Sequence, residues 1–114
     1  MTKVYKILPR AEWDAALATG RFEGSAVDLT DGFIHLSTAA QAQETARRYF
    51  AGRASLVVLR LDAGRLGAAL RWEPSRGGDL FPHVYGALDV GLVEAVTEAP
   101  PGPDGVPALG DLPP

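Results

Sequence analysis

The stretch that most constrains the fold runs from Asp31 to Thr38 and reads Asp-Gly-Phe-Ile-His-Leu-Ser-Thr. It begins with an Asp-Gly turn signal and continues as an apolar run typical of a β-strand. It ends in Ser37-Thr38, a start signal for a helix. Because side chains alternate along a strand, we expect Phe33 and His35 to share one face. An imidazole on a strand beside the N-terminus of a helix is well placed to bind a polar or anionic ligand.

The second of the chain's two histidines lies in another apolar stretch, which runs from Phe81 to Tyr85 and is followed by a glycine. Alternation along a strand puts His83 and Tyr85 on one face, so a titratable ring lies beside a ring able to stack on a ligand. The alternative is a loop histidine beside a core tyrosine. We expect His35 and His83 to lie on opposite walls of one cleft, because each sits in a short apolar run next to a glycine turn.

A glycine-containing loop between the two histidines is a candidate anion site. Glu73 and Arg76 bracket a Pro-Ser pair, and Gly77 and Gly78 follow directly. Glycines allow the backbone to approach a ligand closely, and a guanidinium pairs with phosphate or carboxylate. The alternative is a solvated hairpin loop.

Hydrophobic periodicity predicts an α+β domain with two main helices. The first helix is expected from Pro9 to Gly20. The second is expected from Thr38 to about Ala51, where Thr38 and Gln41 have the spacing of a capping box. Strands are expected in short segments, at residues 3–8, 33–36, 56–62, 70–73, 80–85 and 92–98.

Two segments are less regular. Residues 21–30 are predicted to form a turning, partly exposed segment from which Phe22 and Val27 reach the core. Of the last sixteen residues, six are proline and three are glycine, so this segment is expected to bury too little surface to offset its ordering entropy. We therefore expect one globular domain over residues 1–98 and an extended or disordered tail over residues 99–114.

Composition and charge argue against several classes of protein. The formal net charge of −3 argues against general nucleic-acid binding, and no apolar run approaches the roughly 18 residues that span a membrane. With no cysteine, disulfides and thiolate metal sites are excluded. The N-terminal residues lack the pattern of a signal peptide, so a cytoplasmic protein is expected. No metal is expected, because the histidines show no ligand spacing; a site built from His35, His83 and Asp31 is the alternative.

Several motifs together resemble one known family, the domain of unknown function 952. The residues that carry the resemblance are Val4-Tyr5-Lys6-Ile7, Trp13, Asp31 to Thr38, Gln41, Thr45, Tyr49-Phe50, Trp72-Glu73 and Phe81 to Gly86. The resemblance covers residues 3 to about 96. It implies a small ADP-ribosyltransferase-like α+β fold, with two short twisted sheets around a cleft that holds NAD in the enzymes of that fold.

A more distant similarity is to the C-terminal half of NAD-dependent RNA 2′-phosphotransferases. Their His-x-His-Leu-Ser motif falls on Phe33 to Ser37, so only His35 of its two histidines is present in this chain. The order of the following helix, apolar strand and glycine-containing loop is also similar. Both resemblances imply NAD or a related nucleotide as the ligand.

An NAD site would give each candidate residue a role. His35 would hydrogen-bond the ribose on the nicotinamide side, and the rate would come from positioning and electrostatics. The candidate catalytic residues are His35, Glu73 and His83, with Glu94 as the alternative to Glu73 for the carboxylate that acts on the nucleophile. The candidate ligand-binding residues, which would support the site, stack on a ring or neutralise phosphate, are Asp31, Ser37, Thr38, Arg76, Gly77, Gly78 and Tyr85.

Three functions remain open at this point, because a fold does not fix a function. The first is an enzyme of ADP-ribosyl chemistry that uses NAD. The second is a non-catalytic module that binds a nucleotide or small anion in the same cleft. The third is an interaction domain that contacts a protein partner through Phe81 to Tyr85 or through the tail.

Overall fold

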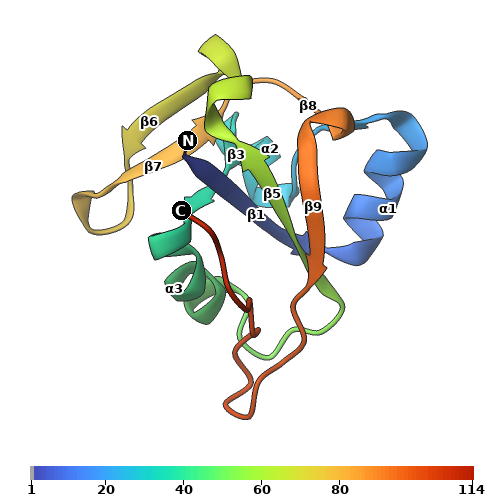
Figure 1. Cartoon of the computed structure of the whole chain (residues 1–114), viewed down its shortest axis with the longest axis vertical. Helices are drawn as coiled ribbons and strands as arrows, with labels where there is room; N and C mark the ends of the chain where they lie inside the picture. Colours follow the sequence, from blue (N-terminus) through green and yellow to red (C-terminus); the bar gives the residue numbers. More distant parts are fainter. Residues whose placement is uncertain (1) are drawn as a thin grey trace.

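The apolar run from Leu56 to Asp62 forms strand β5, and its buried side chains suit a central position in the main sheet. In the computed structural model, which describes residues 2–114, this four-stranded antiparallel sheet has the order β4-β1-β5-β9 (Figure 1). Strands β1 and β5 pair over all seven residues of each. The other three strands of the sheet are β1 (Lys3–Pro9), β4 (Ser37–Thr38) and β9 (Val93–Glu98).

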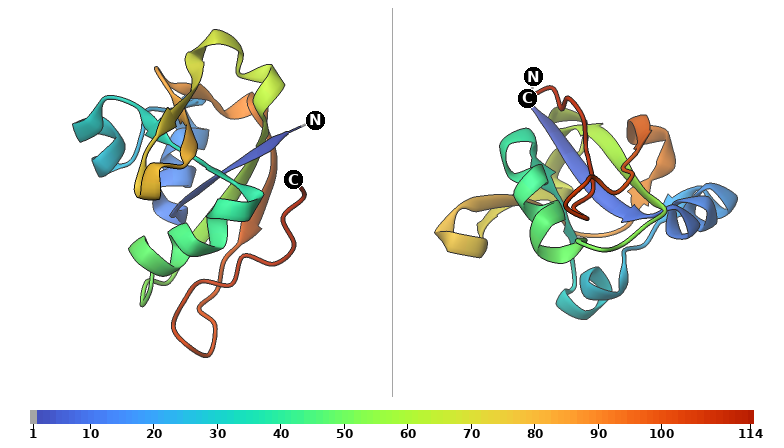
Figure 2. Two further views of the ribbon diagram at one scale, coloured as in Figure 1. Left: turned by 90° about the vertical axis from the view of Figure 1, so that its left-hand side faces the viewer. Right: turned by 90° about the horizontal axis from the view of Figure 1, so that it is seen from below.

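A smaller sheet contains both histidines. Its strand order is β3-β7-β6, with β3 (Ile34–His35), β7 (Leu80–Val84) and β6 (Leu70–Pro74). The register places His35 directly opposite His83. The hairpin formed by β6 and β7 projects from the body of the molecule (Figures 1 and 2). A third sheet pairs β2 (Arg21–Phe22) with β8 (Leu88–Asp89), so residues 2–114 form three antiparallel sheets where two were predicted.

The α-helices of the described part of the chain are α1 (Arg10–Thr19), α2 (Ala26–Asp31) and α3 (Ala39–Tyr49). The predicted capping box of α3 is confirmed, because Thr38 Oγ1 accepts a hydrogen bond from the Gln41 amide and Gln41 Oε1 accepts one from the Thr38 amide. Short 3₁₀ turns lie at η1 (Ala63–Arg65), η2 (Gly67–Ala69), η3 (Arg76–Gly78) and η4 (Val90–Leu92). Within residues 2–114, no helix is both long enough and apolar enough to cross a membrane.

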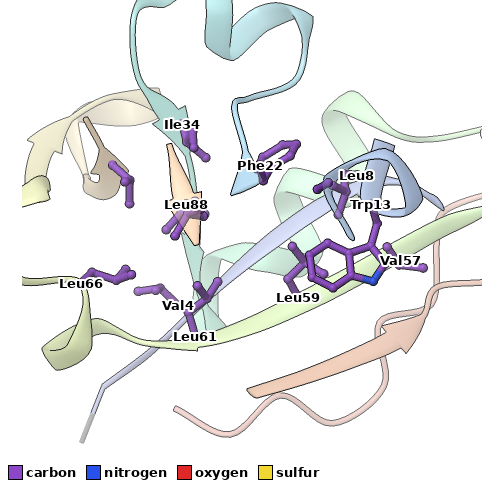
Figure 3. Packing of buried hydrophobic residues seen from close by; sticks show 13 residues of the cluster. Val4, Leu8, Trp13, Phe22, Ile34, Val57, Leu59, Leu61, Leu66 and Leu88 are labelled. Atoms are coloured by element: carbon purple, nitrogen blue, oxygen red, sulfur yellow. The ribbon is translucent and has the colours of Figure 1, made fainter. Parts of the chain in front are cut away.

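Two apolar cores lie on the two faces of the main sheet, because alternate residues of β1 and β5 point to opposite sides. The first core (Figure 3) includes Val4, Leu8, Trp13, Phe22, Ile34, Val57, Leu59, Leu61, Leu66 and Leu88. The second core lies beneath α3 and consists of Tyr5, Ile7, Ala42, Ala46, Leu56, Val58, Ala99 and Leu109. The small side chains of α3 allow the helix to approach the sheet closely.

The C-terminal segment, residues 99–114, is extended and packs on the domain, so residue 98 does not mark the end of the packed core. Leu109 is buried in the second core, with the partly buried Leu112 beside it. The side-chain amide of Gln43 donates a hydrogen bond to the Pro107 carbonyl, and the Tyr5 hydroxyl donates one to the Pro113 carbonyl. The apolar residues between the prolines thus pack against the surface formed by the small alanine side chains of α3.

Residues 21–31 differ from the predicted turning segment. They form β2 and the short helix α2, and Phe22 is buried as predicted. Val27, predicted to lie in the core, is 56% exposed, whereas Asp28 is 2% exposed. The geometry of α2 explains why Asp28 is buried in place of Val27. Asp28 forms the N-terminal capping box of α2 with Ser25 and therefore points inward.

Candidate functional site

The two histidines are neighbours at the junction of β3 and β7. Their ring centroids lie 5.4 Å apart in an edge-to-face arrangement. The Phe33 ring stacks on His83 with centroids 4.2 Å apart and lies 4.6 Å from His35, so Phe33 and His35 share a face as predicted. Both histidines line one cleft of about 600 Å³. They are therefore adjacent on one sheet and not on opposite walls, because the register makes them cross-strand partners.

His35 is held between two carboxylates. Its Nδ1 lies 2.6 Å from Asp28 Oδ1, and its Nε2 lies 2.9 Å from Asp31 Oδ2. The backbone amide of His35 also donates a hydrogen bond to Asp28 Oδ1 at 3.1 Å. Because an ionised carboxylate only accepts hydrogen bonds, Nδ1 carries a proton in this arrangement. Both ring nitrogens are thus engaged by acidic side chains of the chain itself.

Asp28 connects this histidine to the main sheet. Its Oδ2 accepts hydrogen bonds from the Lys6 ammonium at 2.8 Å and from the Ser25 amide at 2.9 Å. Burial by itself raises the pKa of the Asp28 carboxyl, but the hydrogen bond with His35 and the charge of Lys6 outweigh burial and lower that pKa to about 2. Asp28 is thus an ionised, buried acceptor that fixes His35.

Sequence reasoning missed both Asp28 and Lys6 as parts of the site. The Ser-x-x-Asp spacing of Ser25 and Asp28 is a capping signal that would have placed a helix there. Lys6 lies within an apolar strand and is itself buried, and a buried ammonium needs an acidic partner. These two signals together would have indicated a buried ion pair.

His83 has a different environment. Its Nδ1 lies 2.8 Å from Glu73 Oε1, and the Tyr85 hydroxyl donates a hydrogen bond to the same oxygen at 2.8 Å. The hydrogen bonds from His83 and Tyr85 lower the pKa of Glu73, and the bond to Glu73 raises the pKa of Tyr85. The guanidinium of Arg71 lies over the Tyr85 ring at 4.7 Å. Since the carboxylate accepts, the proton of a neutral His83 ring sits on Nδ1.

Glu73 and Tyr85 support His83 and do not line the cleft. Glu94, the alternative carboxylate, accepts hydrogen bonds from Lys3 and Arg60 and does not line the cleft. Sequence spacing does not distinguish these positions, because strand pairing decides which carboxylate meets which histidine.

The other predicted ligand-binding residues divide into two groups. Asp31, Ser37 and Arg76 line the cleft. Thr38 is used as the cap of α3, while Gly77 and Gly78 have φ values of 69° and 83° and form the turn of η3 without lining the cleft. The glycines therefore serve the turn, which needs the left-handed region.

Two arginines give the cleft positive charge. The Arg76 guanidinium lies 4.8 Å from the Phe81 ring centroid and donates a hydrogen bond to Thr45 Oγ1 at 3.2 Å. The Arg53 guanidinium lies 5.2 Å from the Phe50 ring. Across residues 2–114, no carboxylate oxygen lies within 4.0 Å of either guanidinium. Both arginines therefore keep their charge available for an anion.

The family model for "Protein of unknown function (DUF952)" matches residues 7–96. The chain belongs to the DUF952 family. The match includes both histidines together with Glu73, Tyr85 and Arg76. Lys6 and the C-terminal segment lie outside it.

Solved structures of one protein are similar to this chain over nearly its whole length. The crystal structure of protein CC0527 from Caulobacter crescentus has 60% sequence identity and a TM-score of 0.94, with 96% of each chain covered. A crystal structure of its double methionine mutant has 58% identity and the same TM-score and coverage. The solution NMR structure of CC0527 has 60% identity and a TM-score of 0.87, covering 97% of this chain and 96% of that chain. Among curated proteins, no match is found.

The described residues, 2–114, contain no group of three or more histidine, aspartate or glutamate side chains arranged to hold a metal ion. His35, His83 and Asp31 meet at the cleft, but Asp31 lies beside His35 whereas His83 turns its Nδ1 to Glu73. The two histidines thus line one cleft, but each is bound to carboxylates of its own.

Proposed function

We propose that the cleft binds NAD or a related phosphate-bearing nucleotide. The observation that supports this most is the pair of guanidinium groups, Arg53 and Arg76, that line the cleft without a carboxylate partner among residues 2–114. Guanidinium groups bind phosphate oxygens through charge-assisted, often bidentate hydrogen bonds. A nucleotide would supply the anions that these two side chains lack.

The remaining walls of the cleft suit the apolar and sugar parts of such a ligand. Tyr49, which is 61% exposed, offers an aromatic face for a base or a nicotinamide ring. The Asp31 carboxylate is 42% exposed and accepts hydrogen bonds, so it suits a ribose hydroxyl. His35 would then act on the ribose through Asp31. The cleft volume of about 600 Å³ lies within the range usual for small-molecule sites.

The residues fit nucleotide binding better than transfer of ADP-ribose. Under the ADP-ribosyltransferase-like hypothesis, a free carboxylate acts on the nucleophile, but Glu73 is bonded to His83 and Tyr85, and Glu94 to Lys3 and Arg60. Glu12 lines the cleft, yet its Oε1 accepts a hydrogen bond from Ser25 Oγ at 2.6 Å. With these carboxylates engaged within the fold, the proposed function is binding of the nucleotide without transfer of ADP-ribose.

The interaction-domain hypothesis has weaker support. Residues 81–84 are buried, and residues 99–114 pack on the domain through Leu109. The first segment is therefore inaccessible to a partner, and the second already uses its buried apolar side chain within the chain itself. A non-catalytic binding module would use the same cleft and the same two arginines.

Titration of the purified protein with NAD, ADP-ribose, AMP, nicotinamide riboside and inorganic phosphate, followed by calorimetry, tests the proposal. Arg76→Ala should weaken NAD, ADP-ribose and AMP by about 10-fold or more, because a charge-assisted hydrogen bond contributes ~1.5–3 kcal/mol. Nicotinamide riboside, which has no phosphate, should be affected little.

Arg47→Ala is the matched control, because Arg47 is an exposed arginine of α3 that pairs with Glu44 and does not line the cleft. Its affinities should equal those of the wild type. The proposal fails when none of the nucleotides binds at millimolar concentration, or when Arg76→Ala and Arg47→Ala bind ADP-ribose equally well.

A further inference from the structure

One nitrogen in the cleft has no role in the fold. His83 Nδ1 contacts Glu73, but across residues 2–114 no hydrogen-bond partner exists for His83 Nε2. Among residues 2–114, every fully buried side-chain nitrogen or oxygen has a hydrogen-bond partner. Because Nε2 has none, it is not fully buried and is accessible to solvent in the cleft. With the proton of the neutral ring on Nδ1, Nε2 presents a lone pair to whatever the cleft holds.

We propose that His83 is a general base that takes a proton from a water molecule attacking a phosphoanhydride, the P–O–P linkage of a bound nucleotide. The inference rests on the proposed function, because it needs the nucleotide to be held in this cleft. It adds a reaction, hydrolysis, and a substrate class, nucleotides in which two phosphates are linked.

The position of Arg76 brings phosphate to this base. The Arg76 guanidinium lies over Phe81, which precedes His83 by two residues on β7 and points to the same face. Two residues along a strand span ~7 Å. A phosphate group held by Arg76 therefore lies beside the His83 ring, within reach of a water molecule bound at Nε2.

The supports of His83 keep its ring in one orientation. Glu73 and Tyr85 act as positioning residues, because Tyr85 donates to Glu73 Oε1 and Glu73 accepts from His83 Nδ1. The stacked Phe33 ring restricts rotation from the other side. A base that is positioned in advance needs no reorganisation when the water loses its proton.

Two candidate acids that line the cleft, Lys6 and His35, are engaged within the fold. Both are bound to Asp28, and His35 also lies beside Asp31. Arg71 and Tyr85 also lie close to His83 but do not line the cleft. A leaving group that departs as an anion needs no proton, and a phosphate leaving group meets this condition. Arg53 and Arg76 would stabilise the negative charge that it takes.

With ADP-ribose as the substrate, the water proton moves to His83 Nε2 while the water oxygen forms a bond to one phosphorus. The bond from that phosphorus to the bridging oxygen breaks, and the bridging oxygen keeps the electron pair as part of the second phosphate. The products are AMP and ribose 5-phosphate, and His83 returns its proton to solvent.

Incubation of the full chain with ADP-ribose in ¹⁸O-labelled water tests the inference. Chromatography and mass spectrometry should find AMP and ribose 5-phosphate, with one ¹⁸O atom in only one of the two phosphates. His83→Gln should slow the reaction by about 100-fold or more. Glu73→Gln should slow it by at least about 10-fold and change its pH dependence, because the orientation and protonation of His83 depend on that carboxylate.

Glu44→Gln is the matched control, because Glu44 pairs with Arg47 and Arg48 on the outer side of α3, and it should leave the rate unchanged. Binding of ADP-ribose without hydrolysis above the rate in buffer overturns this inference and leaves the proposed function intact. Failure of ADP-ribose to bind removes both. Hydrolysis that His83→Gln retains also overturns the inference.

A second measurement does not depend on the variants folding. The chain has only two histidines, so their ring nitrogens give separate signals in a long-range ¹H–¹⁵N NMR spectrum of the wild type. The neutral ring of His83 should show a protonated Nδ1 and an unprotonated Nε2. An Nε2–H tautomer at His83 would rule out the proposed base.

Discussion

Replacing Asp28 by asparagine removes the negative charge that joins Lys6, Ser25 and His35. The substitution keeps the size of the side chain, but it replaces one acceptor oxygen by an amide nitrogen that only donates. In the wild type, both carboxylate oxygens of Asp28 accept hydrogen bonds from donor groups, so one set of donors would lose its acceptor. The Lys6 ammonium would remain buried without a counter-charge. Removing one partner of a buried ion pair costs about 3–5 kcal/mol of unfolding free energy.

The lowered pKa of Asp28 gives an independent magnitude and a pH window. A carboxyl whose pKa falls from 3.8 in the unfolded chain to about 2 in the folded protein contributes ~2.5 kcal/mol to stability. This contribution is fully present above the unfolded pKa and is lost as pH falls through the folded pKa. The stability difference between wild type and Asp28→Asn should therefore be constant from pH 7 to about 5 and shrink below pH 4.

Urea unfolding at pH 7, 5, 4 and 3, followed by circular dichroism and by tryptophan fluorescence, measures this difference; unfolding exposes the buried Trp13, whereas Trp72 is already 40% exposed. Asp14→Asn is the matched control, because Asp14 is an exposed residue of α1 with no ion pair among residues 2–114. A destabilisation of less than ~1 kcal/mol at pH 7, or one that does not diminish below pH 4, would refute the argument that Asp28 is an ionised buried acceptor.

Two further predictions concern stability, each measured by thermal or urea unfolding. Leu109→Ala should lower the unfolding free energy by about 2–3 kcal/mol, because it opens a cavity in the second core. Leu17→Ala, at an exposed leucine, is the control. Equal effects of the two substitutions would show that the C-terminal segment does not pack on the domain. Thr38→Ala should lower it by about 1 kcal/mol through loss of the α3 cap, while Thr38→Ser should retain most of that stability; a full loss in the serine variant would contradict the capping role.

Local patterns in the chain were sufficient for much of the architecture. The α+β class, helix α3 with its Thr38–Gln41 cap and the buried strand β5 follow from interactions among residues close in sequence. The same is true of the shared face of Phe33 and His35, since alternation along an extended chain needs no long-range information. Membership of the DUF952 family follows from motifs that the chain displays without a structure.

The placement of the C-terminal segment needed the tertiary structure. Composition alone describes residues 99–114 as a chain too poor in apolar residues to fold. The buried positions of Ala99 and Leu109 depend on a surface prepared by α3 and β1, which composition does not describe. A proline-rich segment is ordered when a preformed apolar face meets its few apolar side chains.

The sequence by itself determined which residues could form the site, and only the tertiary structure decided how they are paired. His35 meets Asp28 seven residues away through the end of α2, Lys6 meets Asp28 across 22 residues, and Glu73 meets His83 through the β6–β7 register. A shift of one residue in that register would turn Glu73 to the other face of the hairpin. Hydrogen-bond partners between strands depend on register, and register is settled by the packing of the whole domain.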